Sequence, residues 1–314
     1  MSQPLDSLPW MKVDMLEEGV QYQIPFNFVV PSEIPHQLCK HPYRHAQIFH
    51  EHLKLPPSMS SKSTYNGKTN TTLDSMAPRV VSVSYRLHFR VGHKRDKTTK
   101  NRVVTVGEWT HLVHINSPRV ERAPVLLLGD SSFYRPYENS YFIQGLRRRR
   151  LGQLSAQAAQ PVAVYAPNLV TNIQISLQFK SSSGNTPPGV VSIHSKLNAI
   201  TAYSHTPWQD FPDMTDPVAW DPSKEYYKET RSLGVSINTL NWEQYLFGDN
   251  ESDAAYRAIL TVPIRLPDHL VYLPSFHSCL VSRFYSLKVA ISHHLGRPWA
   301  SSSKLSLTVP IQIL

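Results

Sequence analysis

The chain has 314 residues, 41% of them hydrophobic and 18% charged, with 25 prolines, 12 glycines and a formal net charge of +9 at pH 7. No apolar run approaches the roughly 20 residues of a membrane-spanning helix, which excludes an integral helical membrane protein. The positive charge permits an anionic partner and selects none. Proline is disfavoured in helix interiors and central strands, so its excess over glycine favours an all-β fold with many turns.

The first candidate strand lies in residues 22–35, YQIPFNFVVPSEIP. Its apolar side chains fall on one parity, as in a strand with one buried face, and they are Ile24, Phe26, Phe28 and Val30. Prolines flank the run at positions 25, 31 and 35, and proline cannot donate to a sheet ladder. We therefore predict a sandwich strand that ends where the chain leaves the sheet.

The next segment, residues 39–52, is dense in side chains that can bind metals: Cys39, His41, His45, His50 and His52. Structural zinc sites use four nitrogen or sulfur ligands, usually in tightly spaced pairs. Pro42 interrupts the segment, and on an extended strand His50 and His52 would share one side. We interpret this cluster as partly exposed loop histidines and assign no metal ligand and no cofactor.

Three segments alternate apolar and polar residues with a period of two, as half-buried antiparallel strands do: 80–91, 172–180 and 304–313. Weaker strand candidates are 109–115, 190–200, 232–238, 255–264 and 284–292. Residues 58–78 are predicted to be a mobile loop, 92–102 a charged hairpin tip, 116–124 an interdomain connection and 180–189 a further loop. This pattern predicts antiparallel sheets packed as sandwiches.

Charged residues mark two candidate contact surfaces. Arg147, Arg148, Arg149 and Arg150, together with Lys94, Arg95 and Lys97, favour anionic lipid headgroups or a phosphorylated tail. Aromatic residues are not interleaved with these charges, so we predict no nucleic-acid partner. The polar side chains of the strand at 80–91 form a candidate peptide-binding face: Ser84, Arg86, His88 and Arg90.

Two further features concern buried structure and catalysis. Arg283 interrupts an apolar strand, so we predict a structural ion pair with a carboxylate. The block LLLGDSSF, residues 126–133, is similar to the nucleophile block of GDSL-type esterases. A hydrolase using Ser131 or Ser132, or a zinc enzyme using the His41–His52 cluster, is the alternative function. No Asp-x-x-His follows near the C-terminus, and the all-β pattern does not suit that enzyme class.

An ordered set of phrases resembles fungal arrestin-like (α-arrestin) proteins. The first-domain phrases are GVQYQIPFNFVVPSEIP, HLKLPPS and SVSYRLHFRV. The second-domain phrases are RRRRLGQLSAQAAQPVAV, PPGVVSIHSKLNAITAYSHTPWQDFP, TVPIRLPDHLVYLPSFHSCLVSRFYSLKVAIS and LTVPIQI. The resemblance implies two antiparallel immunoglobulin-like β-sandwich domains, at residues 1–118 and 119–314. The first sandwich is expected to be incomplete, because in related proteins the phrase at 22–35 follows several strands.

The same resemblance implies a non-catalytic adaptor that binds cytosolic tails of transporters or receptors for ubiquitin-dependent endocytosis. Its implied second partner is a Nedd4-class ubiquitin ligase, which docks on Pro-Pro-x-Tyr. The two Pro-Pro pairs, at 56–57 and 187–188, are followed by Ser58-Met59 and Gly189-Val190, so we predict cargo binding without direct ligase docking. Two widely separated cysteines and no signal-peptide pattern favour a cytoplasmic protein at the plasma membrane or endosomes. Unpaired edges of an incomplete sandwich favour self-association.

Overall fold

The computed structural model describes residues 21, 27–60, 64–65, 72–73, 76–94, 103–116, 135–144, 149–159, 170–182, 184–212, 223–246, 254–293 and 304–313. The chain forms two units, Met1–Ser32 and Glu33–Leu314. In the described part of the first unit, residues 27–30 have no regular secondary structure, and Phe28 and Val30 are exposed. The predicted strand is therefore wrong for this part. Pro25 and Pro31 flank it and offer no ladder donors.

The second unit begins with a short helical segment. A 3-10 helix, η1 (His36–Leu38), precedes α1 (Ala46–Leu53), whose buried side chains Ile48, His52 and Leu53 lie on the face toward the protein. The expectation that His50 and His52 lie on one side of a strand is wrong, because they lie on a helix. Side chains two positions apart on an α-helix point in directions about 200° apart around the helix axis. His52 is buried and His50 is exposed.

The first five-stranded sheet has the order β10-β11-β7-β6-β5, and every pairing in it is antiparallel. Its strands are β5 (Tyr137–Gln144), β6 (Arg149–Ala158), β7 (Val170–Ser181), β10 (Glu243–Leu246) and β11 (Ala254–Arg265). Gly152 in β6 lies so close to its neighbours that a Cβ there would contact the Lys180 carbonyl and come within 2.6 Å of the Phe179 ring. This close approach requires glycine at position 152.

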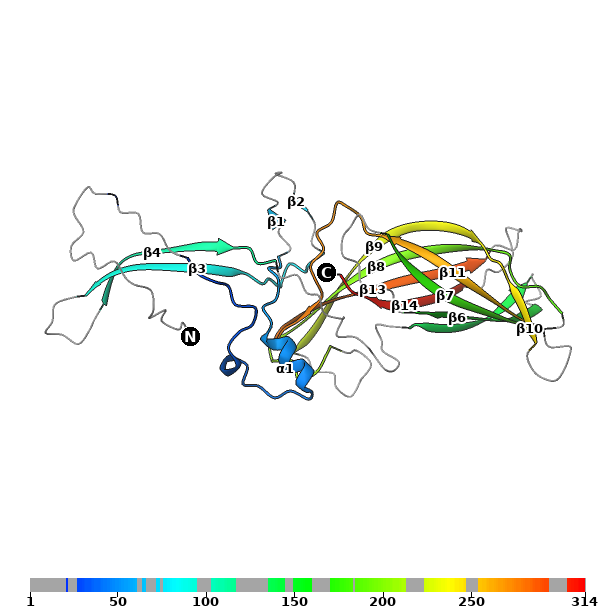
Figure 1. Cartoon of the computed structure of the whole chain (residues 1–314), viewed down its shortest axis with the longest axis horizontal. Helices are drawn as coiled ribbons and strands as arrows, with labels where there is room; N and C mark the ends of the chain where they lie inside the picture. Colours follow the sequence, from blue (N-terminus) through cyan, green and yellow to red (C-terminus); the bar gives the residue numbers. More distant parts are fainter. Residues whose placement is uncertain are drawn as a thin grey trace. The chain divides into compact units, whose positions relative to one another are not determined.

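The second five-stranded sheet has the order β12-β13-β8-β9, with β14 also pairing with β13, and its pairings are antiparallel too. Its strands are β8 (Val190–Ser204), β9 (Lys224–Thr239), β12 (Phe276–His277), β13 (Val281–His293) and β14 (Lys304–Ile311). An isolated bridge between Arg135 and Thr308 joins the edges of the two sheets. Figure 1 shows the labelled strands of the two sheets grouped together.

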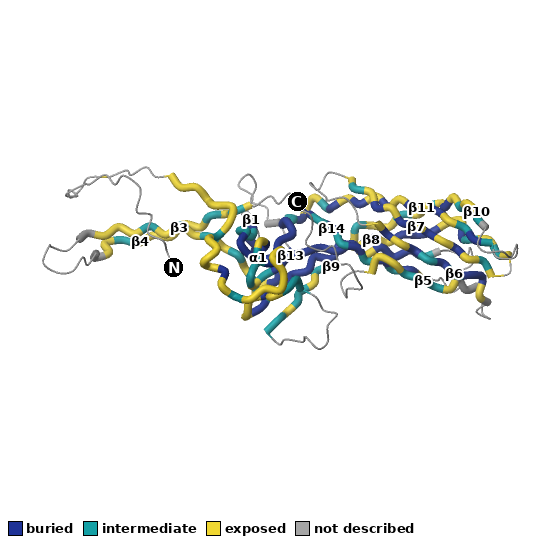
Figure 2. Tube along the Cα trace, turned by 60° about the horizontal axis from the view of Figure 1, so that its bottom comes forward, coloured by how far each residue is buried: buried dark blue, intermediate teal, exposed yellow. Residues whose placement is uncertain are grey.

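The two sheets share one apolar core. Side chains from β6, β7 and β11 of the first sheet meet those from β8, β13 and β14 of the second in a single buried cluster. Buried residues alternate with exposed or half-buried ones along β7, β11 and β14, as expected for strands with one buried face, and dark blue segments alternate with other colours along β7 and β11 in Figure 2. Strand β8 is buried along most of its length. The described residues are therefore a β-sandwich-like, antiparallel all-β structure, and the predicted fold class is confirmed at this level.

Two small ladders lie outside these sheets. β1 (Thr64–Tyr65) pairs with β2 (Thr72–Leu73), and β3 (Tyr85–Lys94) pairs with β4 (Val103–Val113). The β3–β4 pairing confirms the predicted hairpin. Residues 92–94 of its predicted tip lie in β3, and residues 95–102 lie outside the described residues. The prediction of a mobile loop at 58–78 is wrong at both ends, because Met59, Met76 and Ala77 are buried. The predicted domain boundary at 118 and 119 also lies outside the described residues.

In the described part of the chain, no helix is both long and apolar enough to span a bilayer.

Candidate metal centre and recognition surface

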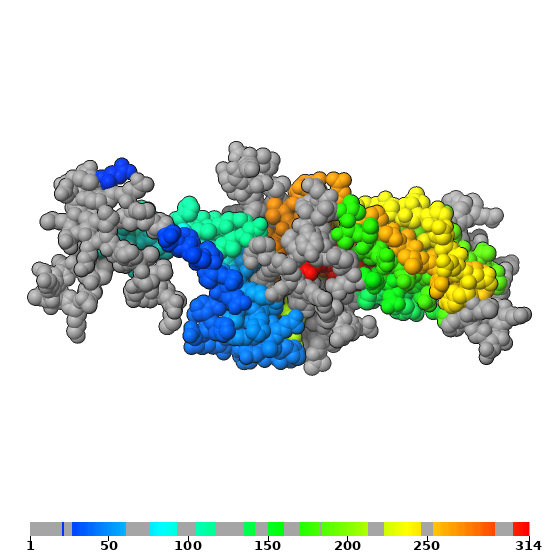
Figure 3. Space-filling view, in the orientation of Figure 1, coloured from blue at the N-terminus to red at the C-terminus, as the bar shows by residue number. Residues whose placement is uncertain are grey.

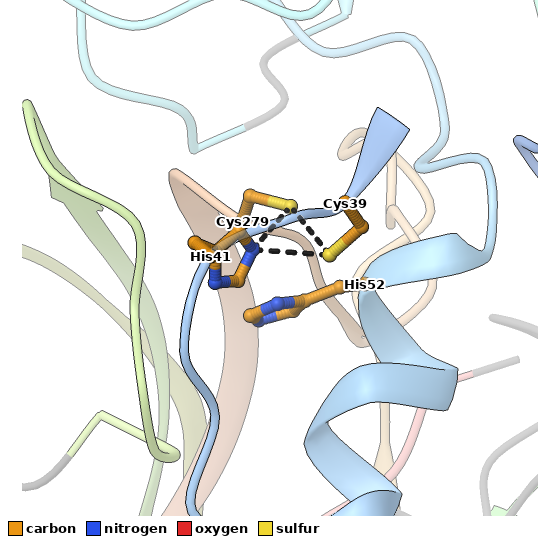
Figure 4. A group of neighbouring side chains, drawn as sticks. All are labelled: Cys39, His41, His52 and Cys279. Atoms are coloured by element: carbon orange, nitrogen blue, oxygen red, sulfur yellow. Dashed lines mark hydrogen bonds between the residues drawn. The ribbon is translucent and has the colours of Figure 1, made fainter. Parts of the chain in front are cut away.

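The described structure brings two histidines and both cysteines of the chain together. Cys39 follows η1, where its N–H donates to the carbonyl of His36, and His41 lies two residues further on. His52 projects from α1, and Cys279 lies in the turn between β12 and β13. We call Cys39, His41, His52 and Cys279 the cysteine–histidine cluster (Figure 4).

The donor atoms of this cluster converge on one point. One ligand atom from each residue lies within 4.8 Å of all the others. The two sulfurs are 3.8 Å apart, and Nε2 of His41 lies 3.1 Å from Sγ of Cys39 and 3.2 Å from Sγ of Cys279. Both cysteines are free thiols in the structure. The arrangement is a Cys₂His₂ donor set.

The second ring nitrogen of His41 fixes the tautomer of that ring. Nδ1 of His41 lies 3.1 Å from the backbone carbonyl of Pro42. A carbonyl can only accept, so Nδ1 carries the proton and Nε2 offers its lone pair toward the two sulfurs. A backbone acceptor on the outer nitrogen is the usual arrangement for histidines that bind metals.

His52 is the most deeply buried histidine of the cluster. Its side chain is 2% exposed, and neither ring nitrogen has a hydrogen-bond partner among the described residues. Burial, aided by the nearby His41, lowers the pKa of His52 to about 4. Burial, together with Cys39, raises the pKa of the Cys279 thiol to about 12. Both shifts have the sign that loss of hydration imposes on a charged form.

Backbone contacts hold the segment before α1 against the C-terminal part of the chain. The N–H of Arg44 donates to the carbonyl of Gln209 at 2.9 Å, and the N–H of Trp208 donates to the carbonyl of Cys279 at 2.8 Å. Arg44 also pairs with Asp210 at 3.6 Å. In Figure 3 the α1 segment, in blue, forms one block with yellow-green atoms at its edge. Residues 208–210 therefore contact both the segment that carries Cys39 and His41 and the turn that carries Cys279.

The structure separates the predicted histidines into two groups. His45 and His50 are exposed, as expected for surface histidines, whereas His52 is buried and His41 half-buried. The description of all four as partly exposed loop histidines is therefore wrong for His52. Sequence reasoning missed Cys279, which lies 240 residues from Cys39. The only sequence signal was that the chain's second cysteine lies beside His277, outside any short ligand motif.

The predicted peptide-binding face is an exposed face of the β3–β4 ladder. Ser84, Arg86, His88 and Arg90 are all exposed. Across the ladder, Glu108 pairs with His88 and with Arg90, the latter at 3.5 Å. Arg86 has no ion pair with any residue that the structure describes. The face therefore carries two arginines and a histidine against a single carboxylate.

Arg283 is buried as predicted, with 0% of its side chain exposed. Its Nη1 donates to the carbonyl of Met76 at 2.8 Å and to the hydroxyl of Thr201 at 2.6 Å, and its guanidinium lies 5.1 Å from the centre of the Tyr285 ring. These contacts give the residue a structural role. The carboxylate partner stays a prediction.

Most of the basic residues predicted to contact lipid or phosphate are not described. Arg95, Lys97, Arg147 and Arg148 lie outside the described residues, as do the side chains of Lys94 and Arg149. Arg150 is exposed and lies 4.4 Å from the centre of the Tyr141 ring. The serines of the alternative hydrolase, Ser131 and Ser132, also lie outside the described part of the chain.

No protein-family model matches the sequence, and no curated protein matches it.

Proposed function

We propose that the protein is a non-catalytic, arrestin-like adaptor that binds cytosolic tails of membrane proteins in ubiquitin-dependent endocytosis. The observation that carries this proposal is the exposed, cationic face of the β3–β4 ladder. The resemblance to fungal arrestin-like proteins supplies the class of cargo, and the antiparallel all-β structure is consistent with it.

The backbone of this ladder suits an extended peptide. Along Tyr85–Lys94 and Val103–Val113, each strand pairs only with the other among the described residues, so each has a second edge without a described strand partner. An extended segment can add to such an edge through main-chain hydrogen bonds. The affinity then comes from the backbone, and side chains on alternate positions supply specificity.

The charges of this face indicate which side chains the peptide carries. Arg86, His88 and Arg90 are spaced two residues apart, so they lie on one face about 7 Å from one another along the strand. A peptide strand beside them presents every second residue to the same face. Acidic or phosphorylated residues at alternate positions would therefore meet the row of cationic groups, with Arg86 as the one that has no described ion pair.

The cysteine–histidine cluster favours this reading over a zinc enzyme. Catalytic zinc sites keep one position for water or substrate, whereas four protein donors complete a tetrahedral shell. The cluster offers four donor residues, two sulfur and two nitrogen. It therefore lacks the open position on which hydrolysis by a zinc-bound water depends.

The test compares two peptides of identical composition, labelled and titrated with the full chain. One carries acidic residues at every second position, and the other carries the same residues in one block. We expect tighter binding of the alternating peptide, about tenfold weaker binding by Arg86→Glu/Arg90→Glu, and weakening at high salt. Arg265→Glu is the control charge reversal, because Arg265 is exposed, ends β11 and lies outside the β3–β4 ladder.

Equal binding of the two peptides, or equal binding by both charge-reversal variants, would contradict the proposal. Turnover of an activated ester that disappears in Ser131→Ala or Ser132→Ala would establish the hydrolase instead. Vesicles with anionic headgroups provide a second comparison, since binding to them with no binding to either peptide also contradicts a peptide-binding face.

A further inference from the structure

We propose that the cysteine–histidine cluster is a structural Zn²⁺ site that fastens the α1 segment to the turn between β12 and β13. Nothing in the proposed adaptor function requires this site. It rests on four observations of the described residues: the donor types, their distances, the tautomer of His41, and the two ring nitrogens of His52 that have no described hydrogen-bond partner.

The donor types select the metal. Two thiolates and two imidazoles in a tetrahedral arrangement are typical of zinc, whereas calcium and magnesium take oxygen ligands. Zn²⁺ with two thiolates has no net charge, so the filled site is neutral in a place where Cys39 is only 5% exposed. Binding displaces the two thiol protons to solvent, and no oxidant or reductant takes part.

The distances between the donors fit a tetrahedron around one zinc ion. Bonds of about 2.3 Å to sulfur and about 2.0 Å to nitrogen place two sulfurs about 3.8 Å apart, and a sulfur and a nitrogen about 3.5 Å apart. The sulfurs of Cys39 and Cys279 are 3.8 Å apart, and the Nε2–sulfur distances of His41 are 3.1 and 3.2 Å. These three distances differ from those of a zinc tetrahedron by no more than about 0.4 Å. The donor nitrogen of His52 lies within 4.8 Å of the other three donor atoms, so His52 makes the largest adjustment. A disulfide would need the two sulfurs about 2.05 Å apart, so at 3.8 Å Cys39 and Cys279 are not bonded to each other.

The two histidines each supply separate support for a metal. Nδ1 of His41 donates to the Pro42 carbonyl, which leaves the lone pair of Nε2 directed at the cluster. His52 is 98% buried, and both of its ring nitrogens are without a hydrogen-bond partner in the described part of the structure. A buried imidazole with no partner is costly. A bond to zinc would satisfy one of these two nitrogens.

The site would join parts of the chain that are far apart in sequence. Cys39 and Cys279 are 240 residues apart, and α1 lies against β12. Since α1 has only eight residues, it is too short to be stable alone. A metal that holds His52 in place therefore stabilises the helix as well as the connection.

The experiment measures zinc in the full chain, purified from cells grown with zinc and without a metal-binding tag. We expect about one zinc per chain, removal by a strong chelator, and reloading of the stripped protein by Zn²⁺ alone. Co²⁺ in place of zinc should give the visible absorption of a tetrahedral ion together with a thiolate charge-transfer band. Cys279→Ser should bind zinc about a hundredfold more weakly, because it loses one of four ligands.

Two further variants keep the test decisive. Cys279→His retains a zinc donor, so it should keep the metal and lose about half of the thiolate charge-transfer intensity, even where Cys279→Ser does not fold. His50→Gln changes an exposed histidine on the same helix and should keep full zinc content. A metal-free wild type that does not load, zinc retained equally by Cys279→Ser, or a Cys39–Cys279 disulfide in freshly purified protein would each overturn the proposal.

Discussion

Replacing Arg283 with alanine should destabilise the second unit by about 3–5 kcal/mol, because its guanidinium makes two buried hydrogen bonds. A hydrogen bond from a charged group contributes about 1.5–3 kcal/mol, and alanine at this position makes neither bond. The two acceptors are the carbonyl of Met76 and the hydroxyl of Thr201, at 2.8 and 2.6 Å. Met76 has a φ of 53°, a conformation that costs a non-glycine residue about 1 kcal/mol, and the bond from Arg283 helps to hold it.

Thermal unfolding followed by circular dichroism measures this effect. The second unit, Glu33–Leu314, has about 280 residues, so its unfolding entropy is about 0.6 kcal/mol/K and the loss corresponds to a Tm about 5–8 °C lower. Arg283→Lys keeps the charge but not the planar fork, and it should fall between wild type and Arg283→Ala. The exposed Arg265, replaced by alanine, is the control and should change stability by less than about 0.5 kcal/mol.

A double-mutant cycle with Thr201→Val separates the hydrogen bond from simple loss of packing. The coupling between the two positions should be about 1–2 kcal/mol, because each variant alone breaks the same bond. A free energy of unfolding for Arg283→Ala within about 1 kcal/mol of wild type would contradict this prediction, because the two buried hydrogen bonds would then contribute almost nothing to stability. Zero coupling would show that the hydrogen bond to Thr201 does not contribute to the stabilising effect of Arg283.

Removing zinc with a chelator should lower the Tm by about 7 °C, because zinc at a thousand times its Kd stabilises the folded protein by about 4 kcal/mol. Thermal scans with chelator and with added Zn²⁺ measure this difference, and equal Tm values would contradict the prediction. Gly152→Ala should cost about 2 kcal/mol or more in urea unfolding, since its Cβ would overlap the Phe179 ring, whereas Gly189→Ala meets nothing within 4 Å and should be near neutral. Glu108→Gln should tighten binding of the alternating acidic peptide about two- to threefold, because it removes the carboxylate that pairs with His88 and Arg90. Unchanged affinity in a titration would contradict peptide binding at this face.

The strands with strict alternation could be predicted from the sequence because burial on one face imposes a period of two. In β7 the apolar parity is 0–1% exposed, and in β14 the predicted inward residues are buried as well. Four of the five weaker candidates lie within β8, β9, β11 and β13, and the fifth, 109–115, overlaps β4 up to Val113. Strands β5 and β6 were not predicted, because small residues such as Gly152 and Ala156 weaken the alternating signal.

The metal centre could not be predicted from the sequence for two physical reasons. Local spacing identifies zinc ligands only when a short loop supplies them in pairs, and here the fourth donor comes from a turn 240 residues away. The second reason is that residues 46–53 form the helix α1 and not an extended strand. An extended chain would orient His50 and His52 alike, whereas the helix buries one and exposes the other.

The two proposals are linked through a short piece of chain. Six residues after His52, the N–H of Ser58 donates to the carbonyl of Ile115 at 2.8 Å, and Met59 exchanges two backbone hydrogen bonds with Val83. Residues 83 and 115 adjoin the ends of β3 and β4, so the metal centre and the base of the β3–β4 ladder share one short connection. Loss of zinc can therefore weaken peptide binding indirectly, by loosening the base of the ladder. Reversing the charge of exposed side chains on β3 changes no ligand of the metal, so those variants should keep full zinc content. Loss of peptide binding with zinc retained is therefore distinguishable from loss of zinc.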